Sequence, residues 1–116
     1  MGINTAAFTA SASTVGTTEK SLTNNSTSIA TQTTAGYYQV FIDAANVAAG
    51  DEFEVALLEK VISGGSQRRV VIGRFLGGQP EIFISPAFLL GVGWDFSLKK
   101  IAGTDRAFDW SVRQVT

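Results

Sequence analysis

The strongest constraint on the fold lies near the C-terminus, where two similar segments follow one another. They read WDFSLK at residues 94–99 and FDWSVR at residues 108–113. In both segments large apolar residues alternate with polar ones, and this period of two places the apolar side chains on one face of a β-strand. We therefore expect two half-buried strands in a chain built mainly from such strands.

The residues between the two segments favour a tight connection, because Gly103 lies near their centre. Strands joined by a short Gly-containing loop commonly pair side by side as an antiparallel hairpin. In the register that keeps all large apolar residues on one face, Phe96 lies opposite Trp110. The residues of this predicted core hairpin are Trp94, Phe96, Leu98, Phe108, Trp110 and Val112.

A second hairpin is expected from two apolar runs that are joined by a Ser-Gly-Gly-Ser turn at residues 63–66. In the predicted register Phe53 faces Phe75 on the inner side, and Leu57 faces Val71 on the same side. The same register also brings residues of opposite charge together across the two strands, which is an independent argument for it.

The other face of this second hairpin carries apolar side chains, where a solvated face would be polar. We expect this face to be covered, either by a second layer of the same chain or by another subunit. The residues of the predicted subunit or capsid interface are Ala56, Leu58, Val70, Ile72, Arg68 and Arg69.

The N-terminal segment, residues 1–20, is rich in Ala, Ser and Thr and carries only Glu19 and Lys20 as charged residues. Small polar side chains bury too little apolar surface to offset the entropy of ordering the chain. We therefore expect an extended N-terminal arm, which is either a frayed terminus or a segment that orders against a neighbouring subunit. Residues 21–116 are expected to form a single β-sandwich domain.

Turn residues divide the chain into about eight short strands, and no stretch has the periodicity of a long helix. Outside the two hairpins, the clearest strand is YYQVFI at residues 37–42. This pattern predicts an all-β fold, namely an antiparallel β-sandwich of the jelly-roll type. A chain of 116 residues has the length of one domain with a modest core.

The sequence contains neither cysteine nor histidine, which excludes disulfides, zinc sites of the Cys/His kind and His-dependent catalytic triads. Asp95 and Asp109 are the first candidates for acid and base catalysis, since paired carboxylates can share these roles. The predicted hairpin, however, places each of them opposite a serine on a solvated outer face. We therefore expect no enzymatic activity, no metal and no cofactor.

Charged residues make up 16% of the chain and the formal net charge is −1. This share is low beside about 25% in typical domains, and weakly charged surfaces tend to associate with other proteins. No basic patch indicates nucleic acid. The most apolar stretch, residues 82–93, is too short to span a membrane and is interrupted by Ser85 and Pro86. The expected partners are therefore proteins, without nucleic acid or membrane.

Two regions contain sequence motifs that resemble those of a known class of proteins. The first is TEKSLT at residues 18–23 with QTTAGYYQ at 32–39, and the second is GWDF at 93–96 with AGTDR at 102–106 and DWSV at 109–112. They resemble small virion structural proteins of tailed bacteriophages. The resemblance implies a decoration or cement protein, commonly a homotrimer, that binds the outer capsid surface and stabilises contacts between major capsid subunits. It also implies a place in the virion, assembled in the host cytoplasm.

Two other functions are compatible with the same sequence. One is a tail, neck or fibre component of such a virion, which would share the fold and the self-association. The other is a jelly-roll carbohydrate-binding module, in which an exposed Tyr37 or Tyr38 stacks on a sugar ring. Core packing is the favoured role for these two tyrosines.

Overall fold

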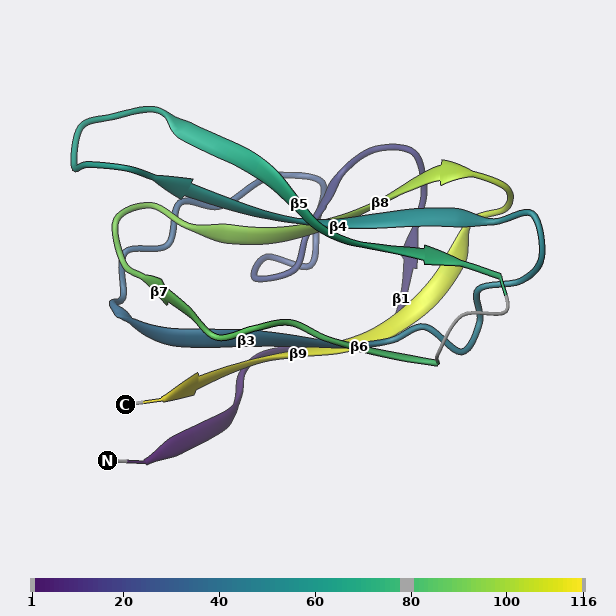
Figure 1. Cartoon of the computed structure of the whole chain (residues 1–116), viewed down its shortest axis with the longest axis horizontal. Coiled ribbons are helices and arrows are strands. Elements are labelled where there is room, and N and C mark those ends of the chain that lie inside the picture. Colours follow the sequence, from purple (N-terminus) through teal and green to yellow (C-terminus); the bar gives the residue numbers. More distant parts are fainter. Residues whose placement is uncertain (1, 78–80, 116) are drawn as a thin grey trace.

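A computed structural model describes residues 2–77 and 81–115 of the chain. These residues form nine strands and no helix, arranged as two antiparallel sheets that pack face to face (Figure 1). The predicted antiparallel β-sandwich is therefore confirmed. None of the described residues belongs to a helix that is long and apolar enough to cross a membrane.

The two sheets have the strand order of a jelly roll. Sheet A contains β1 (Ile3–Val15), β9 (Arg106–Val115), β3 (Gly36–Asp43) and β6 (Ile82–Ile84) in this order, with β7 (Phe88–Leu90) also paired to β3. Sheet B contains β2 (Lys20–Ser21), β8 (Asp95–Ala102), β4 (Glu52–Lys60) and β5 (Gln67–Leu76) in this order. β6 and β7 both pair with β3, at its two ends, and so form two halves of one interrupted strand beside it. The chain then alternates between the sheets except at β4 and β5, which is the jelly-roll arrangement.

The strands β8 and β9 were expected to pair as one hairpin, but they belong to different sheets. β8 pairs with β2 and β4, whereas β9 pairs with β1 and β3. Figure 1 shows the chain turning after β8 and passing to the opposite layer. The predicted pairing of Phe96 with Trp110 is therefore wrong, although all six residues of the expected core hairpin are buried. In an arch, two consecutive strands lie in opposite sheets and pack their apolar faces against each other, whereas in a hairpin they lie side by side in one sheet. Both arrangements bury the same side chains, so the alternation of apolar and polar residues cannot distinguish them.

The turn of this arch is fixed by Asp51, which lies just before β4 and is almost fully buried. Its carboxylate accepts hydrogen bonds from Arg106 Nε at 2.6 Å, from the Thr104 amide at 3.0 Å and from the Ala48 amide at 2.9 Å. The hydrogen bond from Arg106, helped by the two amides, lowers the pKa of Asp51 to about 2. Gly103, with φ of 90°, allows the backbone to turn beside this carboxylate. Asp51 therefore ties sheet B to the start of β9 in sheet A.

The core lies between the sheets and is dominated by aromatic side chains. Tyr38 packs against Trp94 with 4.1 Å between ring centroids and an interplanar angle of 40°, and Phe53 meets Phe108 edge to face at 4.9 Å. The indole of Trp110 donates a hydrogen bond to the Leu22 carbonyl at 2.9 Å. Aromatic pairs of this kind add about 0.5–1.5 kcal/mol each to the burial of their surface.

The β4–β5 hairpin has the predicted register in one half only. Phe53 lies opposite Phe75 as expected, but an extra residue in β5, Ile72, forms a bulge that shifts the pairing by one residue between Val55 and Ala56. Leu57 therefore lies opposite Val70, and the expected pairing of Leu57 with Val71 is wrong. A bulge opposes two residues on one strand to one on the other, so every side chain beyond it changes face.

The expected N-terminal arm is instead an edge strand of sheet A. Residues 3–15 form β1 and pair antiparallel with β9, with register irregularities between Asn4 and Phe8 and between Ala10 and Ser13. The boundary predicted at residue 20 therefore does not separate an arm from the sandwich. Ala and Thr side chains can form a strand where a strongly apolar neighbour supplies the burial, and Phe8 supplies a contact to the core.

Candidate functional site

The face of sheet B that was predicted to be an interface is not an exposed apolar surface. Ala56 and Leu58 lie on its outer side but are buried within the chain. The bulge moves Val70 to the side of Leu57, which faces sheet A, and Ile72 packs against the core. Only Arg69 remains on the same face as Leu58. The six residues of the predicted interface therefore do not form one surface.

The chain covers this outer face with its own residues 16–32, which we call the covering segment. Glu19 accepts hydrogen bonds from Ser97 of β8 and from Arg69 of β5, the latter at 2.5 Å. Ala30 donates its amide to Asp95 of β8 at 2.9 Å and accepts from Gln67 of β5 at 2.8 Å. Both bridges cross β4, which lies between β8 and β5. This confirms a second layer of the same chain, one of the two expected covers.

A charged cluster adds to this cover at the middle of the sheet. Glu54 is buried, and Arg69 donates from Nη2 to its carboxylate at 2.6 Å. Arg74 and Lys99 each approach the same carboxylate to 3.8 Å. The hydrogen bond from Arg69 holds the pKa of Glu54 below its ordinary value, against the opposing effect of burial, and the positive charges act in the same direction as the hydrogen bond.

Asp95 is fully buried beneath the covering segment, so the expectation that it lies on a solvated face is wrong. Its carboxylate accepts from Ser21 Oγ at 2.5 Å, Thr23 Oγ1 at 2.9 Å, the Ala30 amide at 2.9 Å and the Phe96 amide at 2.8 Å. Burial raises the pKa of Asp95, while these donors oppose the rise. The group is a structural anchor that fixes the covering segment to β8.

Asp109, the counterpart of Asp95 in the repeated sequence pattern, is exposed on the outer face of sheet A, opposite Asp43. It accepts a hydrogen bond from the Ala12 amide at 2.6 Å. Because Asp95 and Asp109 lie in different sheets, they do not form a catalytic pair. Within residues 2–77 and 81–115, no group of three or more carboxylates is placed to share a metal ion.

The outer face of sheet A carries an exposed apolar surface that extends over several strands. One row of cross-strand neighbours runs over four strands, from Ile3 through Val115 and Tyr37 to Leu89. Leu89 is 73% exposed, Ile3 71% and Tyr37 52%. We call this surface the apolar face, and its residues are Ile3, Tyr37, Phe41, Ile82, Ile84, Leu89 and Val115.

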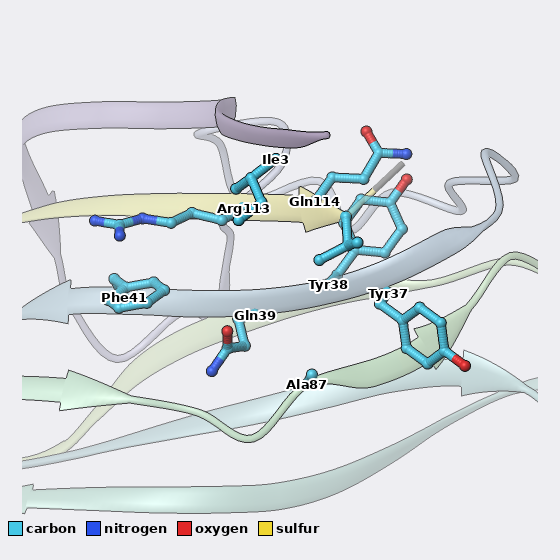
Figure 2. A pocket seen from close by; sticks show the side chains of 9 residues that line it. Ile3, Tyr37, Tyr38, Gln39, Phe41, Ala87, Arg113 and Gln114 are labelled. Carbon is cyan, nitrogen blue, oxygen red and sulfur yellow. The ribbon is translucent and has the colours of Figure 1, made fainter. Parts of the chain in front are cut away.

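A shallow pocket of about 160 Å³ lies within the apolar face (Figure 2). Pockets for small molecules usually measure about 300–1,000 Å³, so this hollow is small for an enclosed ligand. Two of its lining residues are Arg113 and Phe41, and the guanidinium carbon of Arg113 lies 3.7 Å from the centre of the Phe41 ring, a cation–π contact. The arrangement is typical of a contact face with a polar group among apolar ones.

The structure separates the two tyrosines that were candidates for sugar stacking. Tyr38 is buried in the core and donates its hydroxyl to the Thr34 carbonyl at 2.9 Å. Tyr37 is half exposed at the rim of the pocket, and Figure 2 shows its ring beside Ala87. The preferred core role is therefore confirmed for Tyr38 only, and Tyr37 remains available for contact with a partner.

Sequence reasoning missed the apolar face, although the strand at residues 36–43 contained a signal. Its inward residues Tyr38, Val40 and Ile42 form the core, yet Tyr37 and Phe41 point outward. A strand that is apolar on both faces indicates that both faces are covered in the working protein. The same pattern recurs in β6, where Ile82 and Ile84 flank the inward Phe83.

Comparisons with known proteins give little further guidance. No protein-family model matches the chain, and a search of curated protein sequences gives no significant match. Among solved structures, the chain is similar to the N-terminal CBM22-1 and GH10 modules of endo-1,4-β-D-xylanase 10B from Clostridium thermocellum, which were solved with xylohexaose. The sequence identity is 16% and the TM-score 0.47, and the match covers 74% of this chain but 17% of that one. Such a likeness assigns no ligand and no activity to this chain.

Proposed function

We propose that the chain is a non-enzymatic structural protein of a virion, which binds the outer capsid surface and stabilises contacts between major capsid subunits. The observation that carries this proposal is the apolar face of sheet A. Exposed apolar patches that extend over several strands mark surfaces that bind other proteins. The sequence resemblance to small virion proteins of tailed phages supports the choice of partner, and the expected homotrimer belongs to the same proposal.

The composition of the apolar face suits a protein interface. Tyr and Arg are among the residues that contribute most to binding energy, and Tyr37 and Arg113 both line the pocket in this face, together with Ile3 and Val115. Many copies bound to a regular lattice would act together through multivalency. A protein that binds only the mature lattice would stabilise it by mass action.

The test compares the wild-type chain with a Tyr37→Ser/Leu89→Ser variant. We expect the wild-type protein to co-sediment with capsids assembled from the major capsid protein of the same genome, and the double variant to lose binding at least about tenfold. Light scattering on both proteins, without capsids, reports whether the same face also holds the trimer. Co-sedimentation that is unchanged in the double variant would contradict the assignment of this face.

A matched control is available at the β4–β5 turn, where Val61 and Ile62 are also exposed. The Val61→Ser/Ile62→Ser variant removes a similar apolar area from another part of the surface. We expect it to bind capsids as the wild type does. Equal losses in the two double variants would indicate non-specific apolar adhesion.

A second candidate function, carbohydrate binding, is favoured by one observation. The exposed ring of Tyr37 lies at the rim of a pocket that also contains Gln39 and Arg113, and an aromatic ring beside polar groups is a common sugar platform. Binding of a soluble oligosaccharide that persists in Tyr37→Phe and is lost in Tyr37→Ala would favour this function. No binding across a broad glycan panel would contradict it.

A further inference from the structure

The two sheets have four outer edges, and three of them are closed to further strands. β1 carries two register irregularities, and β2 has only two residues before the chain folds back to bridge Ser21 with Ser26. The edge formed by β6 and β7 is interrupted at residues 85–87, which include Pro86. Bulges, short strands and prolines are among the devices that prevent edges from pairing with other chains, and charged side chains are another.

The fourth edge, β5, is long, contains no proline and is protected mainly by its arginines. It extends over ten residues, has a single bulge, and pairs with β4 on one side only. No strand lies on its other side within residues 2–77 and 81–115. Such an edge presents a row of backbone N–H and C=O groups that a further strand can bond.

The side chains along this edge define the kind of strand that fits it. Val70 is 56% exposed and Val71 is 38% exposed, on opposite faces of the strand. Arg68 is exposed and forms no ion pair with any described residue. Arg74 pairs with Glu52 at 3.1 Å, yet 60% of its side chain is exposed, which leaves part of the guanidinium open to a further carboxylate. The strand contains three Arg and no acidic residue, although the net charge of the whole chain is −1.

This charge decides between two occupants. A second copy of β5, paired antiparallel, would bring arginines towards arginines, and like charges on facing strands destabilise pairing. A strand with acidic residues beside β-branched apolar ones would instead place carboxylates near Arg68 and Arg74 and methyl groups near Val70 and Val71.

We propose that the β5 edge binds an extended acidic segment of a different protein, which adds to sheet B as a fifth strand. Backbone hydrogen bonds supply affinity, and the arginines and valines of β5 select the sequence. This surface lies in the sheet opposite to the apolar face of sheet A, so the inference stands independently of the proposed function.

The test uses the full chain and a fluorescently labelled synthetic peptide in which Val and Thr alternate with Glu. We expect saturable binding in fluorescence anisotropy, with amide chemical-shift changes in NMR spectra that concentrate on β5. Three comparison peptides isolate the cause. In an added strand, every second backbone amide would donate a hydrogen bond to β5. One peptide is therefore N-methylated at the odd-numbered residues and the second at the even-numbered residues, so that one of the two loses the amides that bond to β5. The third replaces Glu by Lys.

We expect one of the N-methylated peptides and the Lys peptide to bind at least about tenfold more weakly than the Glu peptide, because backbone bonding and charge both matter. The Arg68→Glu variant should weaken the Glu peptide and strengthen the Lys peptide, while the Tyr37→Ser/Leu89→Ser variant should change neither. If the Glu peptide and both N-methylated forms bound equally well, the interaction would depend on charge attraction alone, and the proposed strand addition would be wrong. No binding up to about 1 mM would show that the arginines close the edge.

Discussion

The outer faces of the two sheets differ in whether the chain itself covers their apolar side chains. On sheet B the chain covers its own apolar side chains with residues 16–32, anchored at Asp95 and at the Glu19–Arg69 pair. On sheet A a row from Ile3 to Leu89 stays exposed, and no part of the described chain covers it. A face that the chain covers itself contributes to stability, whereas a face left bare is available for a partner.

The largest effect is expected from Asp95→Ala, which removes the anchor of the covered face. Several buried donors would lose their acceptor, and each unsatisfied group costs about 1–3 kcal/mol. We expect the free energy of unfolding to fall by about 3 kcal/mol in total, since part of the loss is regained as water enters. Urea unfolding followed by tryptophan fluorescence measures this difference.

The matched control is Asp109→Ala, at the equivalent position of the repeated segment. Its carboxylate is exposed and accepts one hydrogen bond from Ala12. We expect a loss below about 1 kcal/mol. Similar losses in the two variants would mean that the covering segment contributes little and that the two faces do not differ as described.

Acid should weaken the link between sheet B and the arch. The pKa of Asp51 is about 2 in the folded chain and near its ordinary value of 3.8 when unfolded, so the ionised carboxylate stabilises the fold above pH 4. This contribution is lost as the pH falls from about 4 to about 2, and Glu54 acts in the same direction. We expect the thermal midpoint of wild type to fall over this range and that of Asp51→Asn to fall less. Parallel curves for the two proteins would contradict the assignment.

A smaller effect is expected from Arg69→Met, which keeps the aliphatic stem but removes the charge between Glu19 and Glu54. Partly exposed ion pairs contribute little, but Glu54 is buried, so we expect a loss of about 1–2 kcal/mol. Arg68→Met at the next position is the control and should change stability by less than about 0.5 kcal/mol. Denaturant titration gives the free energy of unfolding of both variants. A larger loss for Arg68→Met than for Arg69→Met would contradict the role assigned to Arg69.

The smallest effect on stability is expected from the bare face. Tyr37→Ser with Leu89→Ser should change the free energy of unfolding of the isolated chain by less than about 0.5 kcal/mol, because both side chains already contact solvent. Thermal unfolding at low protein concentration is the measurement. A loss above about 2 kcal/mol would mean that these side chains are packed within the chain, and the contrast between the faces would disappear.

Much of the architecture follows from alternation of apolar and polar residues. It identified most of the strands and the inward residues Phe96, Leu98, Phe108 and Trp110, which are all buried, but it left β1 as an extended arm. It could not tell a hairpin from an arch, because both arrangements bury the same side chains. The pairing of β8 and β9 with other strands depends on contacts that are distant in the sequence.

The candidate site was less accessible to sequence reasoning for two physical reasons. A single bulge in β5 moved Val70 and Ile72 away from the face of Ala56 and Leu58, and nothing in a period of two signals an extra residue. Asp95 was predicted to be an ordinary surface residue. A carboxylate can be buried when enough hydrogen-bond donors surround it, and the sequence pattern does not show which donors will lie near it. Apart from the Phe96 amide, those donors come from residues 21–30, which the pattern left without a clear structure.

The connectivity of the sandwich also determines how it must fold. β4 and β5 are the one pair of consecutive strands that bond to each other in the described chain, and every other pairing joins distant segments. Topologies of this kind close long loops before they gain contacts, and they fold in milliseconds to seconds. β9 lies between β1 and β3, so sheet A stays divided until β9 enters. Until then β1 and β3 present unpaired edges, and this interval is when the chain is most exposed to aggregation.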